Sequence, residues 1–75
     1  MDPQQAWNDL LAAWVRRDWE AVLEYCEALI QWLDKDGFPP EFSYPLDLGK
    51  DFNRATVRAA CEFVYQRASS VMRNP

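Results

Sequence analysis

The chain of 75 residues contains no histidine, and this absence restricts its chemistry more than any other feature. Histidine is the commonest general base and completes most Ser-His and Cys-His nucleophile pairs. Two cysteines alone supply too few ligands for a structural zinc site. The two glycines do not form a phosphate-binding loop. We therefore expect a protein that is not an enzyme and holds no metal or cofactor. A minor enzymatic alternative would place Cys61 or a carboxylate in a composite site with another subunit.

Long apolar runs are also absent. No run reaches the ~20 residues that a membrane-spanning helix needs, so no membrane partner is expected. The chain begins Met-Asp-Pro-Gln-Gln, without the basic start and hydrophobic segment of a secretory signal. Cys26 and Cys61 lie on the apolar faces of separate predicted helices, and we expect both to be buried, reduced thiols. These features predict a cytoplasmic protein.

Glycine and proline are few and clustered. The five prolines lie at the ends of the chain or between Gly37 and Leu46, so the rest of the chain is free to form helices. Asp2, followed by Pro3, suits a helix N-cap, and Asp18 suits a second one. The sequence predicts an all-α fold, a small single domain spanning residues 1–75. It contains an antiparallel helical hairpin, a long hydrophobic lid loop and a third helix whose direction is left open. The predicted ranges are about 3–16 for the first helix, 19–34 for the second, 37–50 for the lid loop and 53–73 for the third.

The predicted loop is long for so small a domain, and it is apolar. Prolines stiffen it into an extended geometry and lower the entropy that is lost when it docks. We expect it to pack across the helices as a lid. Its large apolar side chains are Phe38, Phe42, Tyr44, Leu46 and Leu48.

The third helix is predicted to begin at an N-cap formed by Asn53, with Phe52 and Val57 as a hydrophobic staple. A core stripe follows from Val57 to Val71 at helical spacing. Phe63 falls off this stripe, which makes it a candidate contact residue.

The second helix is apolar around most of its circumference. Its polar residues form one strip of only roughly 80°, whereas an ordinary surface helix keeps about half of its perimeter in water. We expect this helix to be covered from two sides, by the rest of the chain or by a partner, and this surplus of apolar surface favours association. The polar strip consists of Glu20, Glu24, Glu27, Gln31 and Asp34.

The first helix has a broad apolar face, expected to be core, on which Leu11 lies with two tryptophans. This helix contains a Trp, then a Leu three residues later, then a small residue and an aromatic residue six and seven residues after the Trp. Over residues 6–33 this pattern partly resembles a single tetratricopeptide-type hairpin, and the resemblance implies a protein-binding scaffold. Leu11 and Val22 replace small residues of that family, Arg17 replaces a glycine, and one unit is present where about three are typical of a free-standing solenoid. The matching residues are Trp7, Leu10, Ala13, Trp14, Asp18, Trp19, Cys26, Leu29 and, late, Pro39.

Charge is distributed unevenly along the chain. The net charge is −4, yet the third helix carries four arginines against Glu62. We favour the interpretation that this basic helix complements the acidic second helix within the fold. The alternative function is a nucleic-acid-associated regulator, although the acidic net charge argues against a nucleic-acid partner. Its binding residues would be Arg54, Arg58, Arg67 and Arg73.

The sequence thus favours a small non-enzymatic protein–protein interaction module, such as an adaptor, accessory subunit or inhibitor, that also self-associates. Its partner is another protein, which the sequence does not identify, or a second copy of the chain. For the flank of the second helix that carries Trp32, cover by the chain itself and cover by a partner both remain open. The predicted contact residues are Tyr25, Trp32, Phe38, Phe42, Arg58 and Phe63.

Overall fold

A computed structural model describes residues 2–42 and 46–73 of the chain. Three helices form, and the described residues contain no strand, so the predicted all-α fold is confirmed. The helices are α1 (Pro3–Arg16), α2 (Trp19–Asp34) and α3 (Lys50–Arg73). Among the described residues, no helix is long and apolar enough to span a bilayer.

The first two helices begin where the sequence predicts, because their caps are local. The Asp2 carboxylate accepts the backbone N–H groups of Gln4 and Gln5 at 3.1 and 3.2 Å. The Asp18 carboxylate accepts the N–H of Ala21 at 3.3 Å and caps α2. Between the helices, Arg17 adopts a left-handed conformation with φ of 58°, which closes α1 within a single residue. This sharp turn makes α1 and α2 antiparallel neighbours.

The end of α2 is closed by a Schellman motif. The N–H of Asp36 donates to the Leu33 carbonyl at 3.1 Å, and the N–H of Gly37 donates to the Trp32 carbonyl at 2.9 Å. Asp36 carries the left-handed conformation, with φ of 61°. Gly37 follows it and is needed for another reason, the close approach of the Trp32 ring.

The third helix begins at Lys50, three residues before the predicted start. The N–H of Asn53 donates to the Gly49 carbonyl at 3.1 Å, so residue 53 already belongs to the first turn. The Asn53 side chain is buried at 7% exposure and is not an N-cap, and Phe52 is half exposed instead of forming a staple. Both predictions were wrong because Gly49, with φ of 91°, lets the chain enter the helix earlier.

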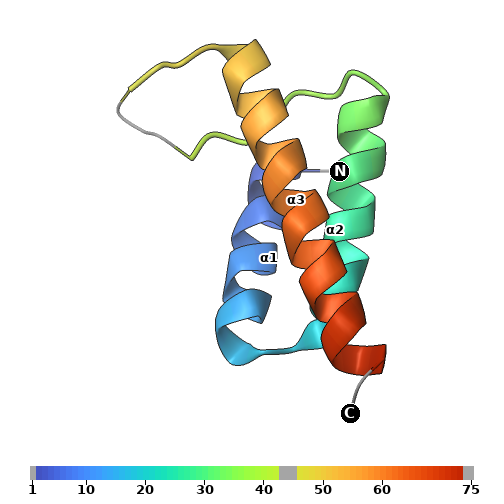
Figure 1. Ribbon diagram of the computed structural model, residues 1–75. Helices are drawn as coiled ribbons and strands as arrows, with labels where there is room; N and C mark the ends of the chain where they lie inside the picture. Colours follow the sequence, from blue (N-terminus) through green and yellow to red (C-terminus); the bar gives the residue numbers. More distant parts are fainter. Residues whose placement is uncertain (1, 43–45, 74–75) are drawn as a thin grey trace.

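The helices alternate in direction: in Figure 1, α1 and α3 run downward, α2 runs upward, and α3 lies in front of the other two. Since α3 runs antiparallel to α2, it runs in the same direction as α1, which settles the direction that the sequence left open. The second helix packs against both neighbours, as predicted. Within these fully described helices, no Cα atom of α1 comes within 8 Å of one in α3. The buried hydrophobic core is formed by Ala6, Leu10, Ala13, Val22, Cys26, Leu29, Leu33, Val57, Cys61 and Ala68.

The loop between α2 and α3 does not form the predicted packed lid. It is anchored beside α1, where the Glu41 N–H donates to Gln4 Oε1 at 2.8 Å and Gln4 Nε2 donates to the Glu41 carbonyl at 3.1 Å. Pro40 is buried at this anchor. Beyond it the described part of the loop, residues 46–48, lies away from the helices (Figure 1). Phe38, Phe42, Leu46 and Leu48 are exposed, and Tyr44 lies outside the described residues.

Candidate interaction surface

The exposed apolar surface of the protein is not on α2. Every large apolar side chain of α2 is buried or half-buried, because α1 covers one flank of this helix and α3 covers the other. The expectation that α2 itself offers a surplus of apolar surface was therefore wrong. Exposed large apolar side chains lie instead on α1, the loop and α3.

Several of these side chains lie on α1 and α3, near the ring contact that joins the two helices. On α1, Leu11 and Val15 are four residues apart on one flank and are 46% and 76% exposed. The adjacent Trp14 ring reaches across to Phe63 of α3, with 6.5 Å between ring centroids. Phe63 itself remains 64% exposed. This contact joins two helices whose backbones are not in contact, and it leaves an apolar surface on either side.

A second contact between exposed rings lies at the start of α3. The rings of Phe42 and Phe52 stack with centroids 6.3 Å apart, and both remain substantially exposed. The two hydrogen bonds between Gln4 and Glu41 hold this part of the loop against α1. We call the surface made by these side chains the α1–α3 face. It consists of Leu11, Trp14, Val15, Phe42, Phe52 and Phe63.

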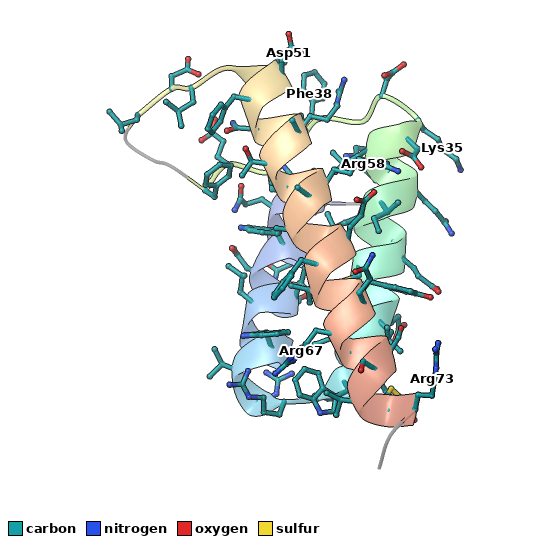
Figure 2. The ribbon with its side chains drawn as sticks, viewed as in Figure 1. Lys35, Phe38, Asp51, Arg58, Arg67 and Arg73 are labelled. Atoms are coloured by element: carbon teal, nitrogen blue, oxygen red, sulfur yellow. The ribbon has the colours of Figure 1, made fainter. Side chains whose placement is uncertain are left out.

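One end of the α1–α3 face is bordered by cations. The Arg17 guanidinium lies 5.2 Å from the centroid of the Trp14 ring and 5.9 Å from that of Trp19. These two indoles meet edge to face at 5.5 Å. Arg67 follows Phe63 by one helical turn, and Figure 2 shows it between α1 and α3. Tryptophan and arginine at the edge of an exposed apolar surface are the residue types that dominate protein–protein binding energy.

The six contact residues predicted from the sequence lie in separate places. Phe42 and Phe63 belong to the α1–α3 face. Tyr25 is half-buried in a shallow depression between α1 and α2, on the other side of the hairpin. Trp32 is half-buried, and its Nε1 donates to the Phe38 carbonyl at 2.8 Å, so the chain itself covers one edge of the indole. The Phe38 ring is exposed, with Lys50 Nζ 4.3 Å from its centroid.

Arg58, the remaining predicted contact residue, is used inside the fold. It forms an ion pair with Asp34 at the end of α2 and a second one with Glu62 at 3.4 Å (Figure 2). Arg54 donates to the Gly37 carbonyl at 3.0 Å and lies 3.6 Å from the Asp36 carboxylate. These arginines tie the start of α3 to the end of α2, which confirms the predicted internal complementarity at this end.

The two cysteines are buried and unpaired, as predicted. A hydrogen bond to the Cys61 thiol, together with burial, raises the pKa of Cys26. Burial also shields the Cys61 sulfur from solvent, which leaves it a poor nucleophile toward external reagents. Among the described residues, no group of three or more His, Cys, Asp or Glu side chains is placed to hold a metal ion.

Sequence reasoning placed Leu11 in the core, treated Phe52 as a staple and did not select Val15. A signal was available, since Trp7, Leu11, Trp14 and Val15 extend the apolar arc of the first helix beyond what one neighbouring helix covers. That signal could not show which flank stays uncovered. Comparisons of the chain with protein-family models, curated proteins and solved structures returned no match.

Proposed function

We propose that this protein is a small non-enzymatic protein–protein interaction module that binds its partner through the α1–α3 face. The proposal is carried by two contacts between partly exposed rings, Trp14 with Phe63 and Phe42 with Phe52, which bring apolar side chains of two helices and the loop to the surface together. Single exposed apolar residues are normal on any protein, but a contiguous patch marks a binding surface.

The chemistry of the face suits a protein partner. Phe63 and Trp14 supply rigid aromatic area, which loses little entropy on binding. Arg17 lies over the Trp14 ring and keeps its charge at the border, where it can meet an acidic group of the partner. The resemblance of residues 6–33 to a tetratricopeptide-type hairpin implies a protein-binding scaffold, in keeping with this proposal. Free cysteines support a cytoplasmic location.

Capture from a native lysate tests the proposal with a matched pair of variants. The face variant replaces Leu11 and Phe63 by serine, and the control variant replaces Phe38 and Leu48, which are also exposed but lie off the face, by serine. Proteins that bind the unmodified chain and the control variant should be lost with the face variant. Equal capture by all three proteins would refute a role for the face.

The alternative, a nucleic-acid-associated regulator, has weaker support. Arg54 and Arg58 are engaged with α2 and the loop, so Arg67 and Arg73 remain as arginines without an ion pair to described residues. With only two phosphate contacts, a plot of the logarithm of the binding constant against the logarithm of the salt concentration would have a slope of about −2. Mobility-shift titrations of nucleic acid with the protein at two salt concentrations separate the two functions. Binding that weakens as the salt concentration rises would support the regulator. Absence of binding at moderate salt would exclude it.

A further inference from the structure

We propose that the partner on the α1–α3 face is a second copy of this chain, bound antiparallel about a two-fold axis. This inference rests on the proposed function and adds the identity of the occupant and its orientation. A two-fold dimer buries the same patch on both subunits, so the patch must complement itself when it is reversed. The distribution of charge, the position of small residues and the size of the face meet this requirement.

The molecule has an acidic and a basic end. Near the start of α3 lie Glu41, Asp47 and Asp51, which outnumber the nearby cations Lys50 and Arg54. At the opposite end the arginines outnumber the acids. Figure 2 shows Asp51 at one end of α3 and Arg67 and Arg73 toward the other. The basic end comprises Arg16, Arg17, Arg67 and Arg73, against Asp18 and Glu20.

This polarity decides the orientation. Two copies aligned in parallel would set the acidic ends against each other and the basic ends against each other. Antiparallel copies place Glu41 of one subunit opposite Arg67 of the other, and the two-fold axis repeats the pair on the far side. Complementary charge at the rim of an interface sets orientation more than it sets affinity.

The centre of the face is suited to close approach. Phe52 and Arg67 lie 15 residues apart on α3, which corresponds to about 22 Å along the helix, and their midpoint falls at Ala59. Ala59 is exposed and small, so two α3 helices can approach there without removing a large side chain. The Trp14 ring contacts Phe63, and Leu11 lies about one turn before Trp14 just as Ala59 lies about one turn before Phe63. Leu11 is therefore at about the same height along the molecule as Ala59.

Reversal about this centre sets Phe52 level with Arg67 of the other subunit and Phe63 level with Thr56. The stacked Phe42 and Phe52 rings of one subunit then lie about one helical turn from the level of Phe63 of the other, and Leu11 lies near the axis. The resulting layer contains α1 and α3 from each subunit, which is a four-helix arrangement with α2 on its outside.

The molecule is large enough to form an interface of standard size. It measures 40 by 24 by 19 Å along its principal axes. The outline of one long side is therefore on the order of the 800 Å² that each partner contributes to a specific interface of standard size.

Sedimentation equilibrium of the full chain between 1 and 200 μM tests the inference, with helicity checked for every variant. These are chosen concentrations, on the order of those at which interfaces of this size associate. The chain, of 8.8 kDa, should sediment as a dimer. Phe63→Glu should weaken association by at least tenfold, and Val15→Glu, at a 76% exposed site that folding does not need, should do the same. Met72→Glu, at an exposed apolar site off the face, should leave the dimer unchanged.

Charge reversal tests the orientation. Glu41→Lys and Arg67→Glu should each weaken the dimer about tenfold, and the double variant should recover most of the loss. A double variant as weak as the product of the single effects would overturn the antiparallel arrangement. A monomer at every concentration would overturn the dimer altogether. If that monomer still captures another protein through the α1–α3 face, the proposed function holds with a different partner. If capture is also independent of the face, both proposals fail.

Discussion

Replacing Gly37 by alanine tests how the end of α2 is joined to the loop. An added Cβ at this position would lie within 3.0 Å of Cδ2, Cε2 and Nε1 of the Trp32 indole. The indole is a rigid bicyclic ring, and its Nε1 donates to the Phe38 carbonyl at 2.8 Å. The ring therefore has to move, and this movement breaks the hydrogen bond that holds the loop to α2.

The magnitude follows from three contributions. Overpacking at a well-fitted site costs about 1–3 kcal/mol, and the lost hydrogen bond costs about 1 kcal/mol. Replacing glycine by alanine restricts the unfolded chain, which offsets about 0.5 kcal/mol. We expect a net loss of about 2 kcal/mol from a total stability of about 4–11 kcal/mol for a chain of this length. With a urea m-value of about 1 kcal/mol/M, the unfolding midpoint should fall by about 2 M.

Urea unfolding followed by far-ultraviolet circular dichroism measures this loss. Gly49→Ala is the control, because φ is 91° there and no atom lies within 4 Å of the added Cβ, so it should cost about 1 kcal/mol through backbone strain alone. In a chain that already carries Trp32→Leu, the Gly37→Ala change should cost less than about 0.5 kcal/mol. A Gly37→Ala protein within 0.5 kcal/mol of the parent, on the order of the measurement error, would show that the indole does not require glycine here.

Three further predictions concern other contacts. In thermal unfolding, Asp36→Gly should be more stable than Asp36→Ala by about 1 kcal/mol, because only glycine tolerates φ of 61° freely. Both variants lose the same exposed ion pair with Arg54, so that loss cancels in the comparison. Equal melting temperatures would contradict this prediction. Arg58→Gln should lower the free energy of unfolding by about 0.5–1 kcal/mol at low salt, because it removes the ion pairs with Asp34 and Glu62. Since salt screens exposed ion pairs, a loss that persists in 1 M NaCl would point to packing instead. The hydrogen bond between the two buried thiols raises the pKa of Cys26 and lowers that of Cys61, so Cys26 is tested without its partner. In a chain that carries Cys61→Ala, burial alone still raises the pKa of Cys26, so its contribution to stability is complete below the unfolded pKa of about 8.5 and is lost as the pH rises above it. Between pH 7 and 9.5, chosen to bracket that pKa, the free energy of unfolding of this variant should fall by about 1 kcal/mol more than that of the Cys26→Ala/Cys61→Ala double variant; identical falls would place the effect elsewhere.

The helix boundaries of α1 and α2 were predictable because local groups create them. Asp2 and Asp18 each cap the helix that follows within three residues, and no distant part of the chain takes part. The start of α3 was mispredicted by the same local reasoning. The pattern around Asn53 suits a cap, yet the preceding Gly49 allows the helix to begin earlier, which buries the Asn53 side chain.

Whether the loop is buried, and which apolar side chains of the helices stay exposed, depends on packing between distant segments. Periodicity shows that a flank of a helix is apolar, but it does not show which neighbour covers that flank. The broad apolar circumference of α2 was correctly predicted to need two neighbours, and α1 and α3 supply them. Both α1 and α3 pack on α2, and they meet each other through the Trp14–Phe63 contact while their backbones stay apart. Leu11, Val15 and Phe63 therefore stay exposed, and no local pattern of residues shows this consequence of helix placement.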